Sequence, residues 1–110
     1  MNSFIQKYIK NLIVILEQID TSSIADIIKL LDKTTGKIYI IGNGGSAATS
    51  SHMANDLGIG LKRRDIKDFC VESLSDNSSV CTAIANDIGY DNIFYTQIQN
   101  KIKKDDILIA

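Results

Sequence analysis

His52, the only histidine in the chain, and Asp56 are the residues whose types and spacing first suggest chemistry. They are four positions apart, so in a helix their side chains lie on one face about one turn apart. An imidazole beside a carboxylate can move protons or supply ligands to a divalent metal. Because zinc normally takes three or four protein ligands, the pair forms at most half of a metal site, and a solvated surface pair is the commoner origin of such spacing.

A glycine-rich segment, residues 42–46 (GNGGS), precedes the stretch that carries His52 and Asp56. Glycines let a backbone approach a ligand closely, and the free N–H groups at a helix start favour an anion or a hydroxylated group. The segment matches neither the dinucleotide-binding fingerprint nor the P-loop. A tight strand-to-helix turn capped by Ser46 would explain the same residues. If the segment does bind a ligand, His52 and Asp56 lie on the helix that begins there.

Other polar residues have a structural explanation beside the functional one. Asn86 and Asp87 precede Gly89, where turn chemistry alone accounts for them. The segment 73–76 (SLSD) ends a predicted strand, so helix capping competes with ligand contact. The basic run 62–64 (KRR) could meet a phosphate but is more often a solvated surface. The aromatic residues near the C-terminus are expected to pack in the last helix and are given no chemistry: Tyr90, Phe94 and Tyr95.

Two amphipathic helices are expected before any strand. Apolar residues recur every three or four positions over 4–19 and again over 24–31, with the polar cluster 20–23 between them and Gly36 as the C-terminal stop. Residues 1–36 should therefore form a helical hairpin. Its apolar surface exceeds what a small sheet can cover, so packing between subunits and packing onto the chain's own sheet are equally open.

From residue 37 onwards, strands and helices alternate. Strands are expected over 37–41, 68–74 and 106–110, and helices over 47–57, ended by Gly58 and Gly60, over 79–85, and over 92–103, capped by Asp91. This order predicts an α/β fold with a parallel sheet, whose ligands bind beyond the carboxyl ends of the strands. The third strand ends at Ala110, so we expect residues 37–110 to be the first part of a longer fold.

The composition restricts the partners. Lys plus Arg total 12 against 13 for Asp plus Glu, so the chain has no net field to hold a nucleic acid or an anionic membrane. The sequence contains no apolar run approaching the roughly 20 residues that cross a bilayer. Cys70 and Cys81 form no C-x-x-C pair and are interpreted as buried thiols of a reducing compartment. We therefore expect a cytoplasmic protein.

Three segments together resemble a known family: 37–58 (KIYIIGNGGSAATSSHMANDLG), 71–94 (VESLSDNSSVCTAIANDIGYDNIF) and 103–110 (KKDDILIA). The sequence is similar to sugar isomerase (SIS) domain proteins, most closely the phosphoheptose isomerases, from the N-terminal helices to Ala110. The resemblance implies a three-layer, flavodoxin-like parallel sheet and a homotetramer whose N-terminal helices pack between subunits. It also implies isomerisation of sedoheptulose 7-phosphate to D-glycero-D-manno-heptose 7-phosphate through an enediol.

The resemblance also implies roles for particular residues. Asn43, Gly44 and Gly45 match a substrate-binding loop with Ser46 beside them, and Asn86 and Asp87 match another substrate contact. His52 matches a zinc ligand. Asp56 stands where the family usually has a glutamate that acts as metal ligand, substrate contact and catalytic base. We expect the serine-rich phosphate loop and the remaining zinc ligands, a glutamine and a histidine, to lie beyond Ala110.

The substitution at position 56 leaves two functions open. Aspartate keeps the carboxylate but is shorter than glutamate by one methylene, and catalytic geometry tolerates only about 0.5 Å of displacement. The first function is a phosphosugar isomerase. The alternative is a non-catalytic SIS module that binds a sugar phosphate or a protein partner, as a replication-initiation factor in the family binds an initiator protein.

Overall fold

A computed structural model describes all residues, 1–110, which divide into two compact units, Met1–Lys33 and Thr34–Ala110. The first unit contains helices α1 (Asn2–Glu17) and α2 (Thr21–Lys33). Both expected N-terminal helices are confirmed, and they begin two and three residues before the expected starts at 4 and 24. Neither helix has a buried residue, and apolar side chains such as Phe4 and Ile28 remain well exposed.

Asp20 sets the start of α2. Its carboxylate accepts a hydrogen bond from the backbone N–H of Ser22 at 2.9 Å and another from the Ser23 hydroxyl at 2.6 Å. Such an acceptor satisfies a backbone donor that has no partner inside the helix. Hydrogen bonds from the two serines lower the pKa of Asp20 to about 2.

The second unit is built on a parallel three-stranded sheet. Strands β1 (Ile38–Ile40), β2 (Val71–Ser73) and β3 (Ile107–Ile109) are ordered β2-β1-β3, with Ile38 level with Val71 and Ile107. All three residues of the central strand β1 are buried. This confirms the predicted α/β fold, since a strand covered on both faces reads as a continuous apolar run.

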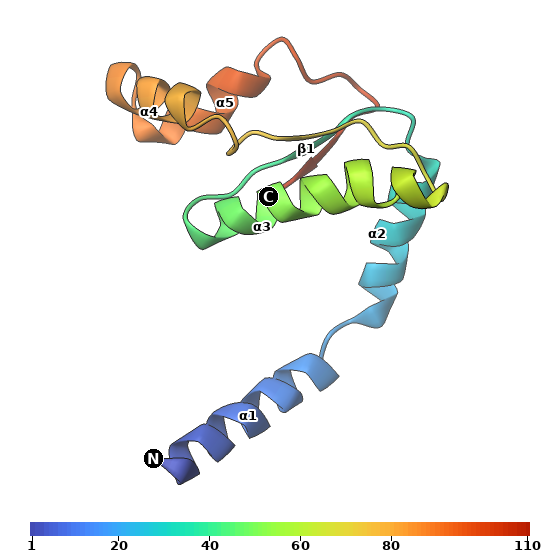
Figure 1. Ribbon diagram of the computed structural model, residues 1–110, viewed down its shortest axis with the longest axis vertical. Helices are drawn as coiled ribbons and strands as arrows, with labels where there is room; N and C mark the ends of the chain where they lie inside the picture. The colour runs from blue at the N-terminus through green and yellow to red at the C-terminus, as the bar shows by residue number, and fades with distance from the viewer. The chain divides into compact units, whose positions relative to one another are not determined.

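Helices make the crossovers between the strands. Helix α3 (Gly45–Asn55) connects β1 to β2, and helices α4 (Ser78–Asp87) and α5 (Ile93–Ile98) connect β2 to β3. Figure 1 shows α3 on one side of β1 and the α4–α5 pair on the other. The chain passes from β1 to β2 on one side and then crosses back past β1 to β3 on the other. Open α/β sheets commonly bind ligands at such a reversal of strand order, at the carboxyl ends of the strands.

The ends of α3 and α5 differ from expectation. Gly58 and Gly60 do not end the third helix, because it continues as a single π-helical turn, Asp56–Gly60, closed by the bond from Leu61 N–H to the Asp56 carbonyl at 3.0 Å. A short 3₁₀ turn, Lys62–Arg64, follows. A second 3₁₀ turn, Tyr90–Asn92, precedes α5, which stops at Ile98. The expected helix over 92–103 is therefore confirmed only over 93–98, and the expected Asp91 cap is wrong because Asn92 is the residue that precedes the helix.

Gly36 serves packing rather than helix termination. Helix α2 already ends at Lys33, and a Cβ on Gly36 would lie 2.1 Å from the Asp105 carbonyl oxygen. The backbone entering β1 thus passes against the backbone entering β3. Asp106 ties the same place together, because its carboxylate accepts from the N–H groups of Lys37 at 2.7 Å and Lys103 at 2.8 Å.

The two cysteines are free thiols, but they are not the buried pair expected from the sequence. Cys70 is exposed and Cys81 is half-buried. Cys70 directly precedes the edge strand β2, so one side of it has no neighbour. None of the helices is long and apolar enough to cross a membrane.

Candidate active site

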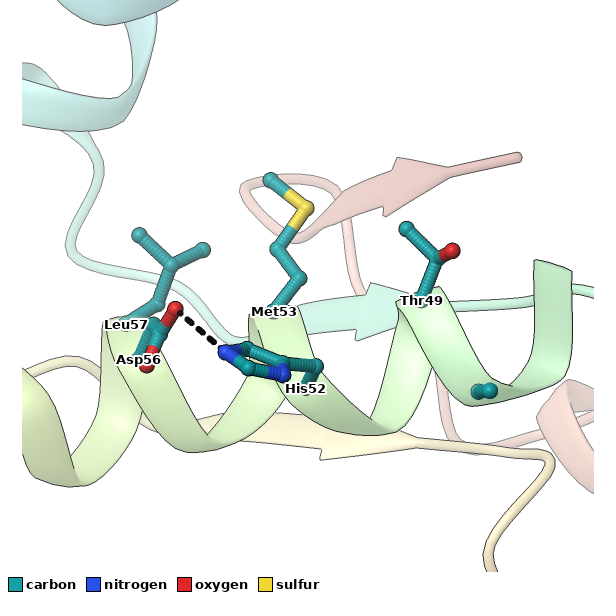
Figure 2. Close-up of a pocket in the computed structure, with 6 residues that line it drawn as sticks. Thr49, His52, Met53, Asp56 and Leu57 are labelled. Atoms are coloured by element: carbon teal, nitrogen blue, oxygen red, sulfur yellow. Dashed lines mark ion pairs between the residues drawn. The ribbon is translucent and has the colours of Figure 1, made fainter. Parts of the chain in front are cut away.

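The His52–Asp56 pair forms as the spacing predicts. His52 Nε2 lies 3.2 Å from an Asp56 carboxylate oxygen, and the two side chains are 77% and 63% exposed (Figure 2). They line an open hollow whose other walls also come from α3 and the start of the π turn: Ala48, Thr49, Met53 and Leu57. Since a single helix face is convex, this chain supplies one wall of a site and leaves the pair open to solvent.

The donor set of this wall is too small for zinc. No group of three or more His, Cys, Asp or Glu side chains in the chain could hold a metal ion. His52 and Asp56 provide two ligands of suitable type, whereas a zinc site normally has three or four from protein. The residues present therefore do not make a zinc site by themselves.

The glycine segment is shaped by two separate constraints. A Cβ on Gly42 would lie 2.4 Å from the carbonyl oxygen of Ser46, so only glycine lets the chain turn back there. Gly44 has φ 55° and ψ −120°, a conformation that L side chains rarely adopt. Gly45 has neither constraint, because a Cβ there meets nothing within 4 Å. Its backbone faces open space, as a ligand-contacting position requires.

A second hollow, of about 180 Å³, opens beside this segment at the carboxyl ends of β1 and β2. Its lining combines the glycine segment with the start of α4 and with α5: Gly42, Asn43, Gly44, Ala47, Ser75, Ser78, Cys81, Thr82, Ile93 and Phe94. The Ser75 hydroxyl donates to the Gly42 carbonyl at 2.7 Å, which ties the two strand exits together. Hydroxyl, amide and thiol groups face a partly apolar wall, which suits a polyol.

Ser46 lies at the start of α3 but does not cap it. The N-cap residue is Gly44, which has no side chain to accept from the helix, and Ser46 is exposed. The Ser46 N–H donates to the Asn43 carbonyl at 2.9 Å and so closes the turn. Its hydroxyl is therefore not used by the capping role that the sequence suggested.

Asn86 and Asp87 are not brought to either hollow. They lie at the end of α4, exposed, with the Asn86 amide donating to the Asp87 carboxylate at 2.7 Å. The hollow at the strand ends is lined by the opposite end of α4. There the Asn77 side chain caps the helix by accepting from Val80 N–H at 3.1 Å. Within one chain, Asn86 and Asp87 are thus separated from the glycine segment by the length of α4.

The strand-end and basic residues have identifiable partners. Ser73 is buried, while Asp76 is exposed and accepts a hydrogen bond from the Ser51 hydroxyl of α3. Lys62 pairs with Asp68 at 2.7 Å. Arg64 donates to the Gly60 carbonyl at 3.3 Å. Lys62 and Arg64 therefore make their contacts within the connection between α3 and β2.

Sequence reasoning missed the contribution of α4 and α5 to the hollow at the strand ends. Ser78, Cys81 and Thr82 follow helical spacing just after a strand exit, and that pattern could have predicted one face turned towards the glycine segment. Phe94, expected only to pack, lines the hollow, and Tyr90 and Tyr95 are about 60% exposed instead of packed. Phe94 reaches the hollow because the chain folds back at α5, and no local sequence pattern predicts that fold.

The chain belongs to the SIS domain family, whose model matches residues 7–110. Among curated relatives, it is 44% identical over 75 residues to the phosphoheptose isomerase of Helicobacter pylori (strain P12), covering 68% of this chain and 38% of that protein. It is 37% identical over 118 residues to the phosphoheptose isomerase of Clostridium acetobutylicum, covering 100% of this chain and 60% of that protein.

A solved structure, phosphoheptose isomerase GmhA from Neisseria gonorrhoeae, is similar with a TM-score of 0.57 and 36% identity, over 66% of this chain and 36% of that one. The chain thus spans between about a third and three-fifths of the length of these relatives. The expected family and fold are confirmed.

Proposed function

We propose that this protein is a phosphosugar isomerase that converts sedoheptulose 7-phosphate to D-glycero-D-manno-heptose 7-phosphate. Its SIS family membership and its relatives named phosphoheptose isomerase support this activity. The observation that carries the proposal is the His52–Asp56 pair, 3.2 Å apart and open to solvent on the helix that begins at the glycine segment.

The pair has the chemistry that an aldose–ketose isomerisation needs. Asp56 removes a proton from C1 of the ketose, the released electron pair forms a C1–C2 double bond, and the C2 oxygen takes up a proton to give an enediol. Return of a proton to C2, with loss of the C1 hydroxyl proton as the C1 carbonyl forms, gives the aldose. His52, within hydrogen-bond reach of Asp56, orients the carboxylate and exchanges protons with the sugar oxygens.

The rest of the substrate is assigned to the glycine segment. Asn43, Gly44 and Gly45 offer backbone and amide groups to sugar hydroxyls, and Ser46 adds an exposed hydroxyl. Asn86 and Asp87 lie at the far end of α4, so they would contact the substrate bound by another subunit. We therefore propose a homotetramer, for which the exposed apolar side chains of α1 and α2 are the support on this chain.

We also propose that the protein binds zinc and that it is cytoplasmic. His52 and Asp56 would be two of the zinc ligands, with the others supplied from outside the described residues, and a bound zinc would polarise the sugar carbonyl. A cytoplasmic location is supported by the exposed free thiol of Cys70, which a reducing compartment preserves.

The deciding experiment incubates the full-length protein with sedoheptulose 7-phosphate, with and without added zinc, and follows aldose formation and C1 proton exchange by NMR. We expect zinc-dependent turnover that Asp56→Asn lowers about 10²–10⁴-fold. Asp91→Asn, which changes an exposed aspartate distant in sequence from the pair, is the matched control and should keep full turnover.

The second candidate function is a non-catalytic module that binds a sugar phosphate or a protein partner. The shortened carboxylate at position 56 favours it. Saturable binding of sedoheptulose 7-phosphate with no proton exchange at C1, at any zinc concentration, would replace the isomerase by this module.

A further inference from the structure

Two buried hydroxyl groups meet between the sheet and the inner face of α3, the helix that carries His52. Ser50 of α3 is 2% exposed and Ser73, the last residue of β2, is 6% exposed; they are the two buried polar residues of the chain. Their oxygens lie 2.7 Å apart. The Ser50 hydroxyl also lies 3.3 Å from the Ile40 carbonyl, at the end of β1.

The direction of every hydrogen bond in this cluster is fixed by its two ends. The Ile40 carbonyl can only accept, so Ser50 donates to it, and Ser73 must then donate to Ser50. The Ser73 oxygen is left to accept the N–H of Ser75 at 3.3 Å. One continuous chain of donors thus runs from the exit of β2, through α3, to the exit of β1.

The same two strand exits hold the glycine segment. The Ile40 carbonyl accepts a second bond from Leu74 N–H at 3.0 Å, and Ser75 donates through its hydroxyl to Gly42 at 2.7 Å. No buried side-chain polar atom in the chain lacks a partner. A fully satisfied network in a low-dielectric interior holds its members in one arrangement.

The positions of Ser50 and His52 on α3 link the hydroxyl pair to the candidate active site. His52 follows Ser50 by two residues, which is about 200° around the helix axis, so the two side chains point to nearly opposite sides. Any roll of α3 about its axis that moved Ser50 from Ser73 would swing His52 and Asp56 by the same angle. The hydroxyl pair ties the inner face of α3 to both β1 and β2, whereas Ser51 reaches only Asp76, beyond the end of β2.

We propose that Ser50 and Ser73 are a positioning pair that fixes the roll of α3, and with it the aim of His52 and Asp56 at a sugar phosphate held by the glycine segment. The effect on turnover rests on the proposed isomerase activity. The effect on His52 itself does not depend on that activity.

His52 is the only histidine of residues 1–110, and in the full-length protein labelled with ¹³C at histidine its ring signals are assigned by their loss in His52→Gln. We expect the His52 ring cross-peaks at fixed pH to shift in Ser50→Ala and in Ser73→Ala, and to stay in place in Ser79→Ala, an exposed serine of α4. If either single variant fails to fold, the double variant Ser50→Ala/Ser73→Ala, which leaves no buried side-chain hydroxyl in the cluster, serves for the same comparison. Coincident cross-peaks in folded variants would overturn the proposal.

Turnover of sedoheptulose 7-phosphate by the full-length protein gives the second measurement. Ser50→Ala should lower kcat about 10–100-fold while KM changes less than about twofold, because displaced proton-transfer groups slow the chemical step without removing substrate contacts. Equal kcat for Ser50→Ala and wild type would also overturn the proposal. If the wild type shows no turnover, the isomerase assignment fails, and the His52 cross-peaks alone decide whether the pair positions α3.

Discussion

At the scale of single residues, the shorter side chain of Asp56 is the feature with the clearest consequence. Helix geometry places its carboxylate 3.2 Å from His52 Nε2, so the pair forms without the additional methylene of a glutamate. The remaining question is how far the carboxylate reaches towards a substrate. The His52–Asp56 distance and the high exposure of both side chains leave room for a longer residue.

Asp56→Glu should therefore be accepted by the fold and should not lower turnover. A longer carboxylate adds one methylene on an exposed face, where substitutions usually change stability by about 0.5 kcal/mol or less. Thermal unfolding and the kcat for sedoheptulose 7-phosphate would be compared with those of wild type. A tenfold loss of kcat in a stably folded Asp56→Glu protein would show that the site has adapted to aspartate.

The glycine segment yields a paired prediction, because its glycines are constrained differently. Gly42→Ala should destabilise by about 1–3 kcal/mol, since its Cβ would overlap the Ser46 carbonyl. Gly45→Ala should leave stability unchanged or raise it slightly, since its Cβ meets no atom. Urea unfolding measures both variants.

Sugar-phosphate binding then separates packing from recognition at Gly45. We expect Gly45→Ala to weaken binding of sedoheptulose 7-phosphate, measured by calorimetry, because the added methyl group occupies the space through which a ligand reaches the backbone. Unchanged affinity in this variant would mean that Gly45 lies outside the ligand contact.

At the scale of elements, the start of α2 depends on one carboxylate. Hydrogen bonds from Ser22 and Ser23 lower the pKa of Asp20 to about 2. A depressed folded-state pKa means that the stabilisation is fully present above the unfolded value of about 3.9 and is lost as pH falls towards 2. Amide signals of residues 21–24 should therefore lose helical shifts between about pH 4 and pH 2.

The matched variants for this prediction are Asp20→Asn and Asp20→Ala. Asparagine also caps helices but does not titrate, so its α2 start should be insensitive to pH over that range. Alanine should show the frayed start at all pH values. A wild-type profile equal to that of Asp20→Asn would contradict the role of the Asp20 charge.

Asp106 performs a comparable task between two strands. Backbone hydrogen bonds from Lys103 and Lys37 lower its pKa, so the bonds should hold at neutral pH and weaken as pH falls below about 4. Asp106→Ala should lower the midpoint of thermal unfolding at pH 7 and reduce the acid sensitivity of the 34–110 unit. Asp105→Ala, a neighbouring exposed carboxylate whose carbonyl and not side chain meets Gly36, is the control.

At the scale of the whole molecule, the exposed apolar side chains of α1 and α2 are the main unsatisfied feature. Ile9, Leu12 and Ile13 are each about half exposed. The proposed tetramer would bury such surface and gain roughly 25 cal/mol per Å² of apolar area.

Ile9→Lys combined with Ile13→Lys should reduce the oligomeric mass measured by light scattering, because lysines resist burial in an apolar interface. Lys7→Ala with Lys10→Ala, which changes charged positions of the same helix, should leave the mass unchanged. An identical mass for the Ile9/Ile13 variant would remove α1 from the proposed interface.

Local periodicity was enough to predict the order of the main helices and strands and the His52–Asp56 pair. A repeat of three or four residues predicts a helix face, and a spacing of four residues places two side chains together whatever surrounds them. The ends of elements were not predicted: the π turn after Asn55 and the 3₁₀ turn before Ile93 have no counterpart in the apolar periodicity.

Which distant groups meet depends on the order of the strands and the path of the crossovers. The strand order β2-β1-β3 brings Ser75 to Gly42, Ser50 to Ser73, and Phe94 towards the glycine segment. It also leaves Asn86 and Asp87 at the far end of α4. Side-chain spacing cannot encode these outcomes, because they depend on how strands pair and how helices cross the sheet, which no single segment of the sequence contains.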